Sequence, residues 1–123
     1  MLVLAAVLVP GTAMGQSKTY TCSFTEPFVR TVFDTHAGTM IVIHDVEKRR
    51  ETLRGLSVSK VDGETVEVRG AGKKAIQRLA RSYNGTDGMS DRVYPYEVIW
   101  TPGRRSLPAT LYGGCESDTE KAK

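Results

Sequence analysis

The stretch SYNGTDGMSDRVYPYEVIW, residues 82–100, gathers the side chains of this sequence that are best suited to chemistry. Ser90 offers a hydroxyl group, and carboxylates and a guanidinium stand on either side of it. The candidate functional residues are Asp87, Gly88, Met89, Ser90, Asp91, Arg92, Tyr94 and Pro95. An acidic loop with an arginine is typical of a small binding or hydrolytic site, but also of a loop that closes one end of a fold.

The catalytic interpretation of Ser90 meets an immediate difficulty. Gly88 precedes the serine by two residues, but Asp91 and Arg92 follow it, so the G-x-S-x-G nucleophile elbow is incomplete. The sequence also lacks an H-E-x-x-H motif, a phosphate-binding P-loop and a Cys-x-x-Cys motif. We therefore expect no catalytic residue, and we favour a protein that is not an enzyme.

A metal site is the second chemical possibility. Asp34, His36, His44 and Asp45 are of metal-ligating types, but their spacing matches no known ligand pattern. His44 ends an apolar run, and we expect it to be a hydrogen-bonded histidine at the surface or at a sheet edge. The sequence therefore predicts neither a metal nor a cofactor.

The loop residues also have structural uses. Asp87 and Ser90 are residue types that bond nearby backbone N–H groups, and Gly88 accepts a positive φ. Met89 is apolar and flexible, which suits it to plugging an open barrel end. Arg92 is expected to pair with a neighbouring aspartate.

Pro95 and the two aspartates also have expected structural roles. Pro95 limits strand pairing on one side, and the expected partner of the arginine is Asp91 or Asp87. We weigh a structural loop above a functional site.

The elements around this loop have a period of two. Val29, Thr31 and Phe33 share one face of the segment EPFVRTVFD, and TMIVIHDV and ETVEVR are similarly rich in β-branched residues. Turn signals such as Asp62-Gly63 separate these segments. The pattern predicts an all-β fold, a small antiparallel barrel or sandwich closed by one disulfide.

One segment is ambiguous. Ile76, Leu79, Ala80 and Tyr83 have helical spacing, so a short helix at 73–82 is possible.

The first fifteen residues resemble a signal for export. Met1 to Val9 is an unbroken apolar run, and Ala13-Met14-Gly15 fits a cleavage site, which predicts a signal peptide at 1–15. We then expect one β domain at 16–116, a disordered polar tail at 117–123 and no membrane span after cleavage. These features predict a periplasmic or secreted protein.

Export also bears on the two cysteines, Cys22 and Cys115. An even pair in an oxidising compartment is usually a disulfide, and we expect this bond, with two free thiols as the alternative. The formal net charge is +3, and the basic stretch around Lys73 and Lys74 is interrupted by apolar residues. We therefore expect no nucleic-acid partner.

Three motifs together resemble a family of uncharacterised bacterial exported or membrane-associated proteins. They are Glu26-Pro27-Phe28, the run Asp87 to Arg92 with Tyr94-Pro95, and Gly114-Cys115. In many members a cysteine precedes the second motif, where this chain has Gly85-Thr86. In its relatives the segment before that motif reads as a strand, which implies a strand rather than a helix at 75–83. The family implies no activity.

A weaker resemblance is to the periplasmic inhibitors of C-type lysozyme, which open with a Tyr-x-Cys like Tyr20-Thr21-Cys22. A positive net charge argues against binding a strongly basic lysozyme. The preferred function is a non-enzymatic binding or cell-envelope module whose partner is an envelope protein or a small ligand. The alternative is an inhibitor-like protein or a small hydrolase that uses the Asp87–Arg92 loop.

Overall fold

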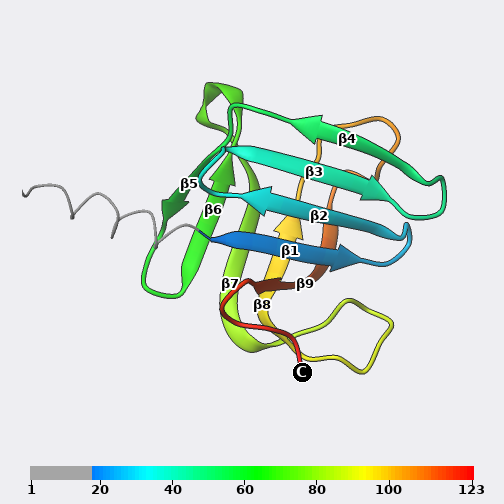
Figure 1. Ribbon diagram of the computed structural model, residues 1–123, viewed down its shortest axis with the longest axis vertical. Coiled ribbons are helices and arrows are strands. Elements are labelled where there is room, and N and C mark those ends of the chain that lie inside the picture. The colour runs from blue at the N-terminus through cyan, green and yellow to red at the C-terminus, as the bar shows by residue number, and fades with distance from the viewer. Residues whose placement is uncertain (1–17) are drawn as a thin grey trace, which may run out of the picture.

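The computed structural model describes residues 18–123, so the expected signal peptide at 1–15 lies outside the described residues. The described chain forms nine antiparallel strands in one sheet that curls into half a barrel, with no α-helix among them (Figure 1). The strands are β1 (Thr19–Phe24), β2 (Val29–Asp34), β3 (Thr39–His44), β4 (Arg49–Leu53), β5 (Ser57–Lys60), β6 (Thr65–Arg69), β7 (Ala75–Gly85), β8 (Tyr94–Trp100) and β9 (Leu111–Ser117). The predicted all-β class is confirmed.

The order of the strands places the first and last strands side by side in the middle of the sheet. It runs β4-β3-β2-β1-β9-β8-β7-β6-β5. Cys22 of β1 stands directly opposite Cys115 of β9, and the two form the predicted disulfide. The bond therefore joins two hairpin arms, β1–β4 and β5–β9, that are otherwise built from separate halves of the chain.

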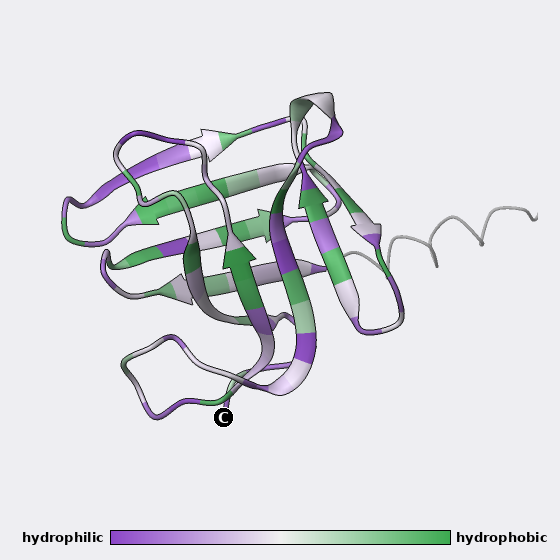
Figure 2. Ribbon diagram, turned by 180° about the vertical axis from the view of Figure 1, so that it is seen from behind, coloured by the Kyte–Doolittle hydropathy of each residue, from purple (hydrophilic) through white to green (hydrophobic). Residues whose placement is uncertain are grey.

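The core lies on the concave face of the curled sheet. Alternate residues of β1, β2 and β3 point into it, as the period of two predicted, and apolar positions recur along the strands in Figure 2. Phe24 and Trp100 pack with ring centroids 5.1 Å apart, and Tyr20 meets Tyr96 edge to face at 5.5 Å. Aromatic rings bury a large apolar area, so these contacts contribute to the stability of the fold.

The segment with helical spacing is strand β7, preceded by one 3-10 turn, η2 (Ala71–Lys73). The possible helix at 73–82 was therefore wrong, and the strand implied by the family resemblance is correct. Gln77 decides the matter, because its side chain is buried and its amide donates to the Thr31 hydroxyl at 2.9 Å. Only a strand places Gln77 and Leu79 together on the concave face.

The sheet bends at the end of β7 and the start of β8. Pairing passes from Arg81–Tyr96 to Gly85–Tyr94, so three residues of β7 bulge opposite Pro95. A bulge of this kind turns a strand and re-aims its side chains. The connection that follows, residues 86–93, is the loop that the sequence singled out, and it folds back toward the turn between β1 and β2 (Figure 1).

Candidate functional site

The three sequence motifs meet in one place. The hydroxyl of Thr25, next to Glu26-Pro27-Phe28 in the β1–β2 turn, donates a hydrogen bond of 2.5 Å to the carbonyl oxygen of Asp87. A side chain at Gly88 would also lie in van der Waals contact with Thr25. Residues 62 positions apart are thereby joined, so the loop at 86–93 is fixed to the body of the fold.

The carboxylate of Asp87 organises the loop. One oxygen, Oδ1, accepts hydrogen bonds from the N–H groups of Met89 and Ser90 at 2.9 and 2.8 Å. The other, Oδ2, accepts from the Ser90 hydroxyl at 2.6 Å and from the Tyr94 hydroxyl at 3.0 Å. All four bonds favour the charged form of the acid. The carboxylate therefore holds the loop in its conformation, which is the role expected of a residue with a structural function.

These bonds set the ionisation of Asp87. Burial disfavours the charged carboxylate, but the hydrogen bonds from Ser90, Met89 and Tyr94 outweigh it and lower the pKa of Asp87 to about 2. A group with so low a pKa is a poor general base near neutral pH. Gly88 follows at φ +88°, the left-handed conformation that its lack of a side chain permits.

Two expected contacts of the loop were wrong. Met89 is 68% exposed and therefore does not plug the barrel. Arg92 contacts neither of the predicted aspartates. Its guanidinium lies 3.5 Å from the carboxylate of Glu116 on β9 and stacks 5.5 Å from the ring centre of Tyr94. The bent loop brings this more distant carboxylate within reach of Arg92.

Tyr94 explains the third motif. Its side chain is buried, but it packs over Gly114 rather than in the concave core. A Cβ atom at residue 114 would stand 2.7 Å from the Tyr94 ring, closer than side chains tolerate. Gly113 is equally confined, because a Cβ atom there would stand 2.2 Å from the carbonyl oxygen of Ser23. Gly114 therefore leaves room for the ring of Tyr94 on one side of β9, and Gly113 leaves room for Ser23 and Phe24 of β1.

The histidines cannot complete a hydrolytic site with Ser90. His36 lies in the β2–β3 turn, and its N–H donates to Asp34. His44 is only 4% exposed and its Nε2 is 2.8 Å from Glu51 of β4. It is hydrogen-bonded as expected, but it is buried rather than at the surface, because it ends β3 on the concave side. Within residues 18–123 there is no group of three metal-ligating side chains.

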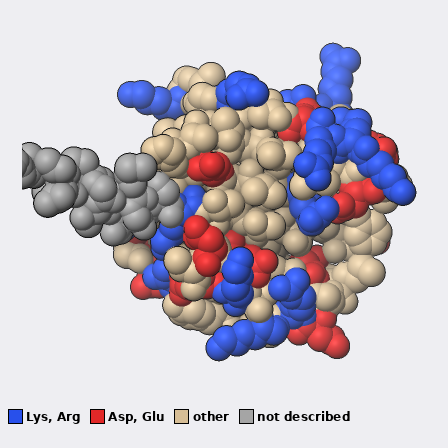
Figure 3. All heavy atoms as spheres, in the orientation of Figure 1, with Lys and Arg blue, Asp and Glu red and all other residues tan. Residues whose placement is uncertain are grey.

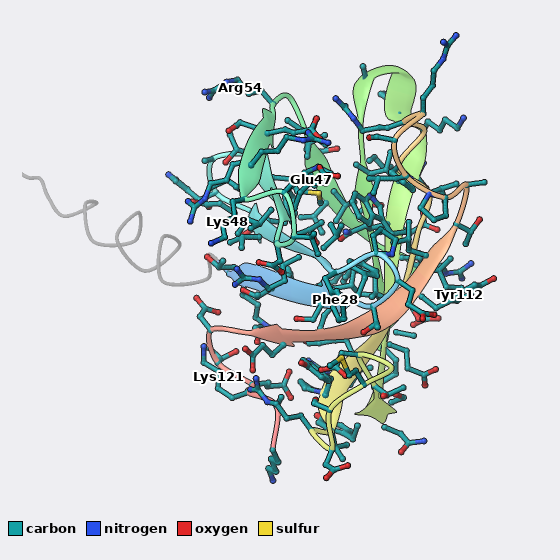
Figure 4. All side chains as sticks on the ribbon, turned by 90° about the vertical axis from the view of Figure 1, so that its right-hand side faces the viewer. Phe28, Glu47, Lys48, Arg54, Tyr112 and Lys121 are labelled. Atoms are coloured by element: carbon teal, nitrogen blue, oxygen red, sulfur yellow. A yellow bond between two sulfur atoms is a disulfide. The ribbon has the colours of Figure 1, made fainter. Side chains whose placement is uncertain are left out.

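A shallow groove runs beside the loop. Its volume is about 280 Å³, and it lies between the β1–β2 turn and residues 87–90. Phe28, 41% exposed, and the exposed Met89 provide apolar walls. The ion pair of Arg30 and Asp45, whose closest atoms are 2.9 Å apart, borders it. The groove offers an apolar surface with a polar edge, and the Asp87 and Ser90 side chains that line it are hydrogen-bonded to each other. Phe28 is labelled in Figure 4, just before β2, the strand that carries Arg30.

The polar tail at 117–123, expected to be disordered, is instead bound to the fold. Lys123 and Val93 exchange two backbone hydrogen bonds of 2.9 Å. Glu120 accepts from Arg81 at 2.9 Å, from Tyr96 at 3.0 Å and from the Tyr83 hydroxyl at 2.8 Å. The domain therefore continues past residue 116. The local sequence pattern does not reveal these contacts, because the partners of Glu120 lie 24 to 39 positions away.

Burial and charge fix the ionisation of this cluster. Burial raises the pKa of Tyr96 to about 12, and the hydrogen bond to Glu120 raises the pKa of Tyr83. Hydrogen bonds, that from Tyr83 first, lower the pKa of Glu120. The carboxylate is therefore charged at neutral pH and holds the tail against β7 and β8.

Comparison with protein-family models, with curated proteins and with solved structures finds no match. Among residues 18–123, no helix is long and apolar enough to cross a membrane. Figure 3 shows Lys and Arg side chains beside Asp and Glu side chains on the face it presents.

Proposed function

We propose that this chain is an exported, non-enzymatic binding module of the cell envelope, which holds a partner in the groove between Phe28 and Met89. One observation carries the proposal: the loop uses its polar groups internally and presents its apolar groups outward. Both Asp87 oxygens and the Ser90 hydroxyl are engaged within the loop, while Met89 and Phe28 are exposed.

Exposed apolar side chains are informative when they lie next to each other on a rigid surface. Phe28 and Met89 come from segments about 60 residues apart, and the Thr25–Asp87 hydrogen bond holds them at one groove. Methionine adapts its shape to a partner, and an aromatic ring adds contact area at small entropic cost. A protein or peptide segment with an apolar side chain fits this surface best.

The hydrolase alternative has less support. The Ser90 hydroxyl donates a hydrogen bond to a carboxylate whose pKa is about 2, and within residues 18–123 no histidine is hydrogen-bonded to Ser90. A serine without a base remains a weak nucleophile. We expect no turnover of a panel of chromogenic esters and glycosides.

The test of binding uses the mature protein with an affinity tag and an extract of the cell envelope. We expect capture of a specific partner that Phe28→Ser and Met89→Ser abolish. Val61→Ser is the matched control, because Val61 is an exposed apolar residue, 45%, in the β5–β6 turn. Capture that all three variants retain, or hydrolysis of any substrate in the panel, would contradict the proposal.

Export is tested separately. The mass of the protein recovered from the periplasm or medium should correspond to a chain that begins at Gln16. Recovery of a chain that still carries Met1 would contradict the signal-peptide prediction.

A further inference from the structure

A second cleft, of about 380 Å³, lies between the bulge of β7, the start of β8 and the C-terminal segment. Its volume is within the range of small-molecule sites. Its walls include Tyr83, Val93, Tyr94, Pro95, Lys121 and Lys123. Of the loop at 86–93 it includes only Val93, and none of its residues lines the Phe28–Met89 groove.

Tyr83 is the most unusual residue of this cleft. Its φ is +55°, a left-handed conformation that is rare for a bulky aromatic residue, and its side chain is 60% exposed. Because the ring is exposed, its burial does not offset the strain of the backbone. Backbone strain of this kind concentrates at ligand-binding positions, where the surrounding structure maintains it. The bulge therefore presents an aromatic ring to solvent at the wall of a cleft.

The ring is also held in a fixed position. The Tyr83 hydroxyl donates to Oε2 of Glu120, while Oε1 of Glu120 accepts from Arg81 and Tyr96. The charge of Glu120 is matched by that of Arg81, 2.9 Å away. Glu120 thus positions the aromatic ring and leaves the cleft without a net negative charge.

Two lysines supply positive charge at the same cleft. The backbone bonds between Lys123 and Val93 hold the end of the segment extended, and Glu120 and Ala122 are half-buried. Lys121 and Lys123 alternate with them and are exposed at the cleft. Within residues 18–123 neither lysine forms an ion pair, whereas the nearby Arg81 and Arg92 both do. The position of Lys121 on this segment is visible in Figure 4.

We propose that this cleft binds an acidic glycan, a sugar chain that carries carboxylates. The flat apolar face of a sugar ring packs on Tyr83 and on the Val93–Pro95 wall, and a carboxylate of the sugar meets Lys121 and Lys123. Aromatic side chains offer a large apolar surface for such packing, and ammonium groups bind anions without demanding a fixed geometry. This site is separate from the proposed apolar groove, so an experiment can refute one proposal without refuting the other.

The experiment measures binding of tetragalacturonate to the intact protein by calorimetry at low salt. The comparison ligand is the fully methyl-esterified tetramer, which has the same rings without the charge. We expect the acid to bind at least tenfold more tightly than the ester, and we expect added salt to weaken it. Equal affinity for the two ligands, or no binding of the acid, overturns the proposal.

Variants locate the site. Tyr83→Gly removes the ring and accepts the left-handed backbone, so we expect an intact fold and a loss of affinity of tenfold or more. Tyr112→Ala is its control, because Tyr112 is an exposed tyrosine, 70%, and lies far from Lys121 in Figure 4.

Lys121→Ala with Lys123→Ala should reduce binding of the acid to the level of the ester. Lys74→Ala, at an exposed lysine outside the cleft, should leave it unchanged. If Tyr83→Gly binds like Tyr112→Ala, or the double lysine variant binds like Lys74→Ala, the cleft is not the site and the proposal fails.

Discussion

The hydroxyl of Thr25 donates to the carbonyl oxygen of Asp87 at 2.5 Å, and this contact joins the β1–β2 turn to the β7–β8 connection. Its significance lies in what Asp87 does at the same time. The carboxylate of Asp87 binds the following turn and the hydroxyl of Tyr94, so one residue links the turn, the loop and β8. A change at Asp87 should therefore affect three parts of the fold together.

We predict that Asp87→Ala lowers the free energy of unfolding by about 1 to 3 kcal/mol, several degrees in melting temperature for a domain of this size. The reason is that the N–H groups of Met89 and Ser90 and the hydroxyl of Tyr94 lose their acceptor. Asp91→Ala is the matched control, since Asp91 is an exposed aspartate of the same loop. Thermal unfolding that is equal in the two variants would refute a structural role for Asp87.

The same residue predicts a dependence on pH. An ordinary aspartate has a pKa of about 4, and the folded pKa of Asp87 is lowered to about 2. Its stabilisation is therefore fully present above about pH 4 and disappears as the pH falls toward 2. The difference in stability between the parent and Asp87→Asn should shrink over that interval. A difference that stays constant from pH 6 to about pH 2 would contradict this origin of the shift.

The sequence predicted the strands of this fold well because their information is local. Val29, Thr31 and Phe33 were expected to share one face of a strand, and all three are buried. The disulfide was predicted from two facts alone: the expected export to an oxidising compartment and the even number of cysteines. Both predictions depend on neighbours in the chain or on general chemistry, and neither needs a tertiary contact.

The sequence could not predict contacts that depend on the curl of the sheet. Arg92 pairs with Glu116 of β9 rather than with an adjacent aspartate, because β8 and β9 are neighbours in the sheet. The sequence around Glu120 is typical of a solvated tail, but in the fold Glu120 binds Arg81 of β7 and Tyr96 of β8. The helical spacing around Leu79 predicted the wrong element for the same reason. Gln77 of strand β7 lies in the core because it binds Thr31, 46 residues away.

Cys22 and Cys115 provide a third prediction. Unreduced, denatured protein should contain no reactive thiol, because the two residues are bonded across β1 and β9. The pair Cys22→Ser and Cys115→Ser should lower the free energy of unfolding by about 4 to 5 kcal/mol, the entropy of closing a loop of this length. Two reactive thiols in the parent, or equal stability of the double variant, would contradict the prediction.

Gly114 is expected to tolerate no side chain. Gly114→Ala should lower the melting temperature by several degrees, because the added carbon would stand 2.7 Å from the ring of Tyr94 and displace it from the sheet. Gly63→Ala is the control, as nothing lies within 4 Å of the position of its Cβ. Chemical denaturation would measure both. Equal midpoints would show that Tyr94 does not need the flat surface of Gly114.

Glu120 offers a prediction with two independent readouts. Replacing it with Gln keeps its shape but removes the charge opposite Arg81, so Glu120→Gln should lower the free energy of unfolding by about 1 to 3 kcal/mol near neutral pH. The pKa of Glu120 is lowered in the folded protein, first through the hydrogen bond from Tyr83, so its stabilisation is present above the ordinary glutamate pKa and is lost at lower pH. Parent and variant should therefore converge in acid.

The second readout of Glu120→Gln is the titration of the tyrosines, followed by ultraviolet absorbance. The hydrogen bond to Glu120 is the main cause of the raised pKa of Tyr83, so the variant should return this pKa toward its ordinary value. Tyr96 should still titrate near pH 12, because burial is the main cause of its shift. Asp118→Ala, a change at an exposed carboxylate of the same segment, should alter neither tyrosine. If the charge of Glu120 does not hold the segment, Glu120→Gln will leave the Tyr83 titration unchanged and its stability equal to that of Asp118→Ala.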